Sequence, residues 1–371
     1  MTASGDLQAH PGMLALARES RGMTQTGVAD AMTEASDGTA VVSQGYVSRA
    51  ESGRLTVGED RLMLYATALG YPPELLCADP QVSGVGIGLI HHRKRAALSA
   101  PALRRIHAQL ALVRLQVSGM AGAAAVREGA HRFPKVVLDD FTTAKDAARQ
   151  VRREWGMPAG PVADVIASVE EAGGWVVMRD LGSDLLDAVS QWDGHQMPLV
   201  LVNDRAPGDR CRFSVAHELG HLVMHTEPGT AGEQEKQADA FASEFLMPAA
   251  DIRQAFAGGV GLGRLAELKR VWRVSMSALL RRAVDLNVLS DWQYRTVAVE
   301  MSALGYRTAE PIVIAPERPR QVDALVDVLL SERGLDLGQA AACARLLPED
   351  FERLYLAGDR SLSHAASKVR P

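Results

Sequence analysis

Residues 209–225 read DRCRFSVAHELGHLVMH and contain the motif HExxH, formed by His217, Glu218 and His221. Apolar residues around the motif recur at helical spacing, so the stretch predicts a helix. Two histidines four residues apart share one helix face, and both imidazoles can then bind one zinc ion. Glu218 lies beside them, where it can take a proton from the attacking water. The stretch therefore predicts a catalytic zinc site.

A catalytic zinc ion uses three protein ligands and leaves one position open. The third ligand is expected from residues 235–248, EKQADAFASEFLMP, whose apolar pattern predicts a second amphipathic helix. Glu235 completes a His-His-Glu set in this interpretation, and Asp239, one turn later, hydrogen bonds a ligand histidine. Glu233 is a competing ligand. His225 drifts by roughly 80° around the first helix, which favours a packing or capping role.

These two motifs resemble those of the ImmA/IrrE metallopeptidases over residues 209–248. The resemblance implies a zincin-like fold in which His217, His221 and Glu235 hold zinc and the HExxH glutamate activates the water. It also implies a substrate class, namely DNA-bound repressor proteins that are cut once to induce their operons. By the same resemblance, the strand Leu199–Asn203 offers an edge along which an extended peptide adds as a further strand.

The N-terminal region, residues 13–70, has a different pattern. Thr24 and Gln25 open one predicted helix, and residues 43–53, SQGYVSRAESG, open with an N-cap serine and close on glycine. The pattern SQxxVSxxExG resembles the XRE-type helix-turn-helix, whose second helix enters the major groove of DNA. The resemblance implies base contacts by Ser43, Gln44, Tyr46 and Ser48, and phosphate contacts by Arg49 and Arg54.

Two features depart from that family pattern. The predicted turn Thr33–Val42 is longer than the usual connection, and residues 1–79 carry five basic against ten acidic side chains. An acidic module disfavours tight binding to phosphates. Residues 80–127 carry seven basic and no acidic side chains, so this segment could supply phosphate contacts through Arg93–Arg95, Arg104, Arg105 and Arg114. A protein-docking helical domain is the alternative to a DNA-binding domain.

Composition sets the protein class. The chain has 371 residues, of which 47% are hydrophobic, 23% charged and 5% aromatic, as in an ordinary soluble protein rich in helix. Three cysteines far apart exclude a disulfide framework and a thiolate metal site. No apolar run approaches the length of a membrane span, and the N-terminus lacks a basic start and an apolar run. We therefore expect a cytoplasmic protein without membrane contact.

The expected fold class is mainly α with a small β-sheet (α+β). It comprises an N-terminal all-α helix-turn-helix domain, a zincin-like metallopeptidase domain and a helical C-terminal region. The first predicted region is an XRE-type domain at residues 1–79, followed by a basic linker with a connecting helix at residues 80–125. An ImmA/IrrE-type peptidase domain at residues 126–256 comes next. A C-terminal domain for dimerisation, sensing or docking covers residues 257–371. Before the HExxH helix, the pattern predicts helices at residues 142–156 and 161–172 and strands at Trp175–Arg179 and Leu199–Val202.

Together these features predict a transcriptional regulator with a zinc-dependent endopeptidase domain that controls a stress, phage or mobile-element response. The expected partners are a double-stranded DNA operator, a repressor or antitoxin-like protein substrate and a second copy of the chain in a homodimer. We expect the peptidase to be restrained at rest by a shielded cleft or through its C-terminal helices. The alternatives are a non-proteolytic sensor-repressor that binds an effector in the peptidase fold, and an antitoxin-type DNA-binding protein.

Overall fold

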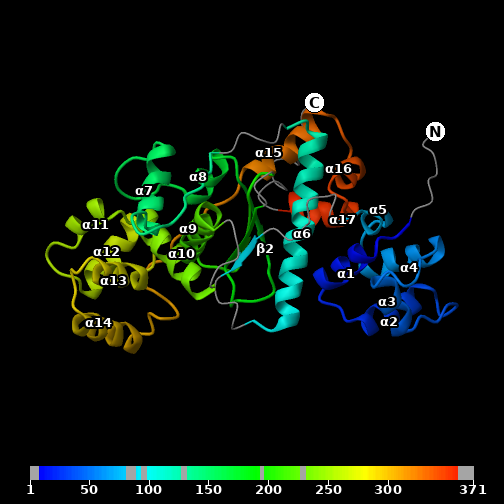
Figure 1. Cartoon of the computed structure of the whole chain (residues 1–371), viewed down its shortest axis with the longest axis horizontal. Helices are drawn as coiled ribbons and strands as arrows, with labels where there is room; N and C mark the ends of the chain where they lie inside the picture. Colours follow the sequence, from blue (N-terminus) through cyan, green and yellow to red (C-terminus); the bar gives the residue numbers. More distant parts are fainter. Residues whose placement is uncertain are drawn as a thin grey trace, which may run out of the picture. The chain divides into compact units, whose positions relative to one another are not determined.

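The computed structural model describes residues 8–80, 89–92, 98–126, 132–192, 196–225 and 231–357. The described residues are mainly helical and include one small sheet, so the α+β prediction is confirmed. The chain divides into two compact units (Figure 1). The first unit contains residues 1–88, 96–128 and 321–371, and the second contains residues 89–95 and 129–320.

The N-terminal helices pack into a small bundle, drawn in blue in Figure 1. Its members are α1 (Pro11–Ser20), α2 (Gln25–Ala35), α3 (Gln44–Glu51), α4 (Glu59–Leu69) and α5 (Pro73–Leu76). The side chains of Thr24 and Ser43 cap α2 and α3 by accepting the backbone N–H groups of Gly27 and Tyr46. Both helix starts therefore lie where the sequence predicts them, and each cap satisfies a backbone donor that the helix itself leaves free.

The turn between α2 and α3 begins later than the sequence predicts. Helix α2 continues to Ala35, so the predicted start of the turn at Thr33 is wrong. The predicted end at Val42 agrees with the structure, since Ser43 is the N-cap of α3. Thr33 explains the extension because its hydroxyl donates to the Ala29 carbonyl one turn earlier, at 2.9 Å. The same oxygen accepts the Val42 N–H at 3.0 Å. One threonine thus stays helical and also anchors the far end of the turn.

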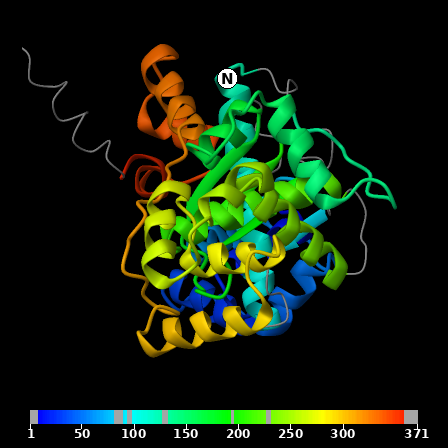
Figure 2. The same ribbon diagram turned by 90° about the vertical axis from the view of Figure 1, so that its left-hand side faces the viewer.

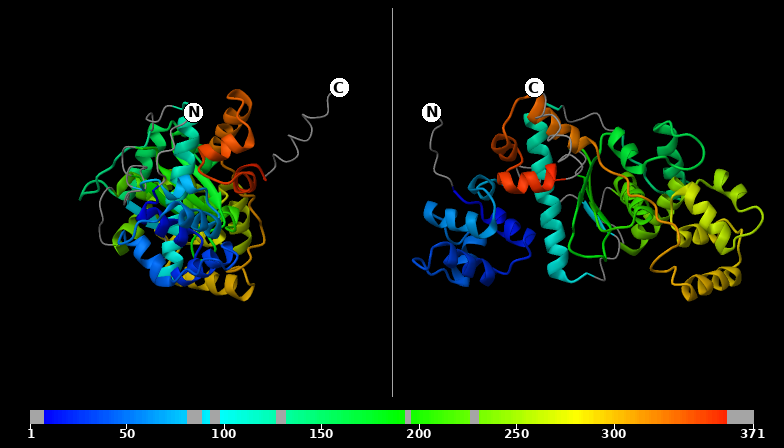
Figure 3. Two further views of the ribbon diagram at one scale, coloured as in Figure 1. Left: turned by 90° about the vertical axis from the view of Figure 1, so that its right-hand side faces the viewer. Right: turned by 180° about the vertical axis from the view of Figure 1, so that it is seen from behind.

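The first unit also contains α6 (Ala100–Ala123), which packs against α1, α15 and α16. Figure 3 shows the orange and red C-terminal helices beside the cyan α6. These C-terminal elements are α15 (Gln321–Asp327), the π-helical turn η2 (Val328–Glu332), α16 (Leu337–Cys343), α17 (Pro348–Phe351) and the π-helical turn η3 (Glu352–Leu356). Residues 321–357 therefore pack with the N-terminal part of the chain.

Helix α6 makes its closest approach to α16 at Gly119, where an added Cβ would overlap the carbonyl oxygen of Cys343. We expect Gly119→Ala to destabilise the first unit by about 1–3 kcal/mol, since backbone atoms of α16 cannot move aside cheaply. Gly122→Ala, on the same helix, is the matched control because nothing lies within 4 Å of its added Cβ. That variant should be neutral or gain up to ~1 kcal/mol. Urea unfolding of both variants measures the difference, and equal midpoints would contradict the close approach.

The second unit is built on a sheet of order β1-β3-β4-β2 among the described residues. The strands are β1 (Leu89–His92), β2 (Trp175–Arg179), β3 (Ala188–Trp192) and β4 (Leu199–Asn203). Strand β2 runs parallel to β4, whereas β3 runs antiparallel to β4 and β1 antiparallel to β3. The sequence predicted β2 and β4 but neither β1 nor β3, since both of these contain two adjacent polar residues that interrupt the apolar run.

The expectation that Leu199–Asn203 offers a free edge is wrong. This strand, β4, lies inside the sheet because β3 pairs with one of its sides and β2 with the other. All five of its residues are buried. The edges of the described sheet are instead β1 and β2, so a peptide cannot add to β4.

The helices of this unit share one hydrophobic core that extends from Phe133 to Met301. They are α7 (Ala144–Glu154), α8 (Val165–Glu171), α9 (Gly208–Met224), α10 (Ala231–Leu246), α11 (Ala249–Ala255), α12 (Leu262–Trp272), α13 (Met276–Asp285) and α14 (Asp291–Ala303). Two of them, α8 and α9, make the main contacts with the sheet. Figure 2 shows the yellow α12 and α13 side by side. The core continues across the predicted domain boundary at residue 257, so residues 257–301 pack with the peptidase region. No described helix is long and apolar enough to cross a membrane.

A buried ion pair joins the start of α9 to the segment after α14. Arg212 contacts Glu317, and both side chains are almost fully buried. The second oxygen of Glu317 accepts the backbone N–H groups of Val165 and Ile166 at the start of α8, at 2.8 and 3.2 Å. The pair therefore holds α8 and α9 together and sets the orientation of the helix that carries the HExxH motif.

Candidate metal site and helix-turn-helix

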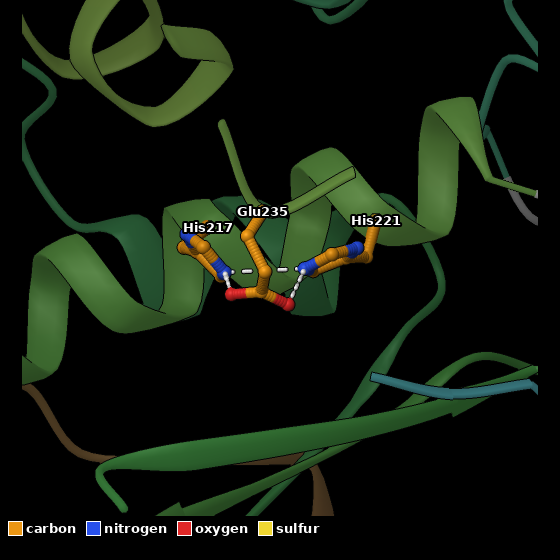
Figure 4. Close-up of side chains that lie close together, drawn as sticks. All are labelled: His217, His221 and Glu235. Atoms are coloured by element: carbon orange, nitrogen blue, oxygen red, sulfur yellow. Dashed lines mark hydrogen bonds and ion pairs between the residues drawn. The ribbon is translucent and has the colours of Figure 1, made fainter. Parts of the chain in front are cut away.

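Helices α9 and α10 bring His217, His221 and Glu235 together (Figure 4). The Nε2 atoms of the two histidines lie 3.1 Å apart. The two oxygens of Glu235 lie 3.4 Å from these nitrogens, one oxygen facing each ring. One donor atom from each of the three residues falls within a 4.8 Å cluster. Glu233, the competing candidate, instead lies beside Gln237, with 3.5 Å between its Oε1 and the amide nitrogen.

The close approach of α10 to α9 depends on Gly220 within the HExxH motif. A Cβ added to Gly220 would lie 3.1 Å from three atoms of the Phe241 side chain, which is fully buried. That separation is tighter than ordinary van der Waals contact, so a larger residue here would push the two helices apart. Glycine at this position therefore lets α10 place Glu235 opposite the two histidines.

Hydrogen bonds on the far side of each imidazole fix its orientation. The Nδ1 of His217 lies 2.9 Å from Oδ1 of Asp239, the predicted partner. The Nδ1 of His221 lies 2.9 Å from Nδ1 of His225, whose Nε2 in turn lies 2.9 Å from the Gln237 side-chain oxygen. Because both Nδ1 atoms are engaged in this way, both Nε2 atoms face Glu235 and stay available to a metal.

The charges of the cluster are set by its burial. Burial lowers the pKa of His217, but the hydrogen bonds that its ring donates to the Asp239 and Glu235 carboxylates outweigh this effect and raise the pKa to about 9. Burial lowers the pKa of His221 to about 4. Burial of Glu235 opposes its ionisation, yet the two histidines outweigh that effect and hold its pKa well below the usual value. Glu235 is therefore an anion that faces a protonated His217 and a neutral His221. A divalent cation bound by all three residues would displace the proton from Nε2 of His217.

Glu218 follows His217 on α9 and is buried against the sheet, with 1% of its surface exposed. The hydroxyl of Ser190 on β3 donates to Oε2 of Glu218 at 2.6 Å. Burial raises the pKa of this carboxyl to about 8, so it can exchange a proton near neutral pH. Sequence reasoning missed Ser190 because it missed β3.

A cavity of about 640 Å³ borders the cluster, and Asp239 forms part of its wall. Its wall also includes Phe213 and Arg210 from α9 and Lys236 and Ala240 from α10. The cavity therefore offers apolar, basic and acidic side chains, and it reaches the metal-binding cluster through Asp239, which contacts His217. Cys211, close by on α9, is buried, and burial raises the pKa of its thiol to about 11. His195, a surface residue in the sequence interpretation, lies outside the described residues.

The predicted base-reading residues lie on and before α3. Ser43 and Gln44 are exposed, whereas Tyr46 and Ser48 are half-buried. The Ser43 hydroxyl is the N-cap of α3, and the Arg61 guanidinium lies over the Tyr46 ring, 5.4 Å from its centroid. Among these four residues, Gln44 therefore combines exposure with a long polar side chain that can reach a base edge.

A hydrogen-bonded chain orients Gln44. Its amide donates to Gln25 on α2 at 2.7 Å, and Gln25 donates to Glu51 at 2.9 Å. Glu51 also accepts two hydrogen bonds from Arg18 on α1, at 2.7 and 3.0 Å. Helices α1 and α2 thus hold the start of α3 in place, through a network that no local sequence pattern indicated.

The basic side chains near α3 differ in their surroundings. Arg49 and Arg54 are exposed at the C-terminal end of α3, where they can approach a phosphate. Arg104 on α6 instead lies 3.5 Å from Glu19 of α1, so part of its charge is already balanced. The basic run Arg93–Arg95 lies outside the described residues.

Comparisons with known families agree with the two predicted resemblances. Residues 14–76 match the family model described as helix-turn-helix, which spans α1 to α5. Residues 169–284 match a peptidase family model described as IrrE N-terminal-like domain, which includes β2 to β4 and the helices α9 and α10. A search of curated proteins finds no match to the chain.

Proposed function

Because one chain combines a helix-turn-helix domain with an IrrE N-terminal-like peptidase domain, we propose that this protein is a DNA-binding regulator that cuts a protein partner at a zinc site. The proposal rests on one observation above all. His217, His221 and Glu235 meet on two packed helices beside the buried Glu218. Three ligands next to a general base form the arrangement that hydrolytic zinc sites use.

The donor set fits zinc in its chemistry. Imidazole nitrogen and carboxylate oxygen are ordinary zinc ligands, and three protein ligands leave a position for water or substrate. His217 and His221 would bind through Nε2, since their Nδ1 atoms face Asp239 and His225. Such outer contacts hold the rings in place and make the ligand nitrogens more basic.

Zinc, when bound, supplies a Lewis acid that activates water and polarises the scissile carbonyl. Glu218 accepts the proton of the attacking water on its carboxylate and passes it to the leaving amine as the peptide bond breaks. Ser190 holds the Glu218 carboxylate in place by the 2.6 Å hydrogen bond to Oε2. Asp239 and His225 keep the ligand rings oriented during the reaction.

The expected substrate is a repressor or antitoxin-like protein, cut to relieve repression during a stress, phage or mobile-element response. A peptidase domain joined to a DNA-binding domain supports this proposal because the DNA-binding domain can bring the peptidase to proteins on the same DNA. The cavity beside Asp239 has room for a substrate side chain. The homodimer and the cytoplasmic location remain predictions from the sequence.

Proteolysis can be tested before the natural substrate is known. The zinc-loaded full chain is incubated with a proteome-derived peptide library, and new termini are identified by mass spectrometry. We expect a small set of cuts that share a sequence preference and vanish when a zinc chelator is added. A library without chelator-sensitive cuts would overturn the peptidase proposal and favour the non-proteolytic sensor-repressor.

DNA recognition is expected to depend on Gln44. The test uses a DNA duplex that the wild-type chain selects from a random-sequence library. At one base pair of this duplex, the Gln44→Ala variant should lose about 1–3 kcal/mol of its preference for the correct base over the other bases. Arg49→Ala should instead weaken binding to all sequences. It should also reduce the slope of log affinity against log salt concentration by about 1, the amount expected for one lost phosphate contact. Gln254→Ala, an exposed glutamine on α11, is the matched control and should change neither property. Unaltered discrimination in Gln44→Ala would remove this residue from the interface.

A further inference from the structure

The sheet edge nearest Glu218 is occupied by a segment of this same chain. Strand β1 pairs antiparallel with β3 over four residues, with Leu89 opposite Trp192 and His92 opposite Val189. Within this register, His91 lies opposite Ser190, the residue that donates to Glu218. The backbone of β1 therefore passes along the strand that contacts the proposed general base.

Strand β3 would be an edge strand if β1 were absent. Its other neighbour is β4, and the order of the sheet leaves β3 without a further partner on the β1 side. An edge strand presents unpaired backbone N–H and C=O groups to which an extended peptide can add. Because β3 is the strand that contacts Glu218, a peptide added there would lie beside the proposed catalytic residue. In Figure 4 a blue-green strand lies beside a green strand below the helix that carries His217 and His221.

The course of the chain sets β1 apart from the rest of the sheet. Residues 89–95 belong to the second compact unit, whereas the segments directly before and after them belong to the first. This strand also lies outside both family-matched segments, residues 14–76 and 169–284. Neither matched domain therefore includes β1.

We infer that residues 89–92 occupy the position of the substrate strand and compete with the protein substrate for the edge of β3. The catalytic consequence rests on the proposed function, but the occupation of the edge does not. A substrate can add to β3 only in those molecules in which β1 has left the edge. The apparent affinity for the substrate therefore equals the intrinsic affinity multiplied by the fraction of such molecules.

The first test uses backbone pairing and needs no cleavage. Adjacent residues of a strand direct their N–H groups to opposite sides, so Ile90→Pro/His91→Pro removes at least one donor that faces β3. Ile90→Ala/His91→Ala keeps every N–H group and is the matched control. The probe is a fluorescent peptide of residues 86–95, GIGLIHHRKR, with a scrambled peptide of equal composition as its control.

We expect the proline variant to bind the probe about tenfold more tightly than the wild-type chain or the alanine variant, since its edge is free. Equal affinity for all three proteins, or no specific binding to any, would overturn the inference. Hydrogen exchange serves as the folding check. Amides of β3 should exchange faster in the proline variant, while those of β2 and β4 should keep their protection.

The second test measures catalysis with the peptide library. The proline variant should cut about tenfold faster than the wild-type chain. A disulfide between Ile90→Cys and Gln191→Cys, in a Cys77→Ser/Cys343→Ser background, should slow cutting until a reductant is added. Probe binding without cutting by any variant would defeat the proposed peptidase function and leave the competing strand intact. Cutting by all variants at equal rates, locked or unlocked, would defeat the competing strand and leave the peptidase intact.

Discussion

The Glu218→Gln variant is expected to keep its zinc and to lose cleavage, with kcat/KM about 10²–10⁴-fold below the wild-type value. Glutamine has nearly the same shape and still accepts the hydrogen bond from Ser190, so the site should stay folded. Its amide cannot take the proton of the attacking water. The rates are measured on the peptide that the wild-type chain cuts fastest, together with the zinc content of both proteins.

Glu267→Gln is the matched control for this experiment. Glu267 lies on α12 in the same unit, and its side chain is 62% exposed beside Arg264. This change removes the same charge without touching the site, so activity should stay at the wild-type level. Equal activity of Glu218→Gln and wild type, at equal zinc content, would remove Glu218 from the mechanism.

The Glu235→Ala variant is expected to lose more than about 100-fold in zinc affinity, because loss of a mere outer contact already costs about 10–100-fold. Glu233→Ala, on the same helix, should keep the wild-type affinity. Glu235 faces both Nε2 atoms at 3.4 Å, whereas Glu233 lies beside Gln237. Competition with a coloured chelator measures both affinities in metal-free protein.

The Asp239→Asn variant, measured in the same way, should show a smaller loss of zinc affinity than Glu235→Ala. The amide keeps a contact with Nδ1 of His217 but lacks the negative charge, so zinc affinity should fall by about 10–100-fold. An unchanged affinity in Glu235→Ala, with a loss in Glu233→Ala, would show that the third ligand has been assigned to the wrong glutamate.

The local part of the candidate site was predictable because helices have a fixed period. Spacing alone placed His217 and His221 on one face of a helix, and it placed Glu235 and Asp239 on one face of a second helix. The structure has all four residues in that arrangement. Sequence reasoning left Glu233 open, since the spacing did not say which face of α10 meets α9. The contact between Gly220 on α9 and Phe241 on α10 determines which face of α10 meets α9.

The sheet was less predictable because short strands carry little periodic signal. Strand β3 has five residues, AVSQW, and its polar residues are buried within the unit rather than alternating with apolar ones. Because β3 was not predicted, β4 was wrongly expected to be an edge strand of the sheet, and the contact of Ser190 with Glu218 was not found. Strand β1 depends on a partner about a hundred residues away in sequence, and no local pattern encodes such a pairing.

Contacts between distant segments were also beyond the sequence. The pair of Arg212 and Glu317 spans 105 residues, and each residue by itself resembles an ordinary exposed charge. His225 is the C-cap of α9, in agreement with the capping role that the sequence favoured, but its side-chain contact with His221 was missed. Its angular position argued against a metal ligand, yet its ring reaches back one turn to Nδ1 of His221. Side-chain direction, and not position on the helix alone, decided that contact.

The central claim is that zinc held by His217, His221 and Glu235 makes this DNA-binding chain a peptidase, and a zinc titration of activity tests it most directly. Metal-free full chain receives zinc in steps while cleavage of the fastest-cut library peptide is followed. We predict that activity rises from zero to a plateau at one zinc per chain, and that Glu218→Gln binds the same zinc without any activity. Cleavage by the metal-free chain, or a fully loaded wild-type chain that cuts nothing, would contradict the claim.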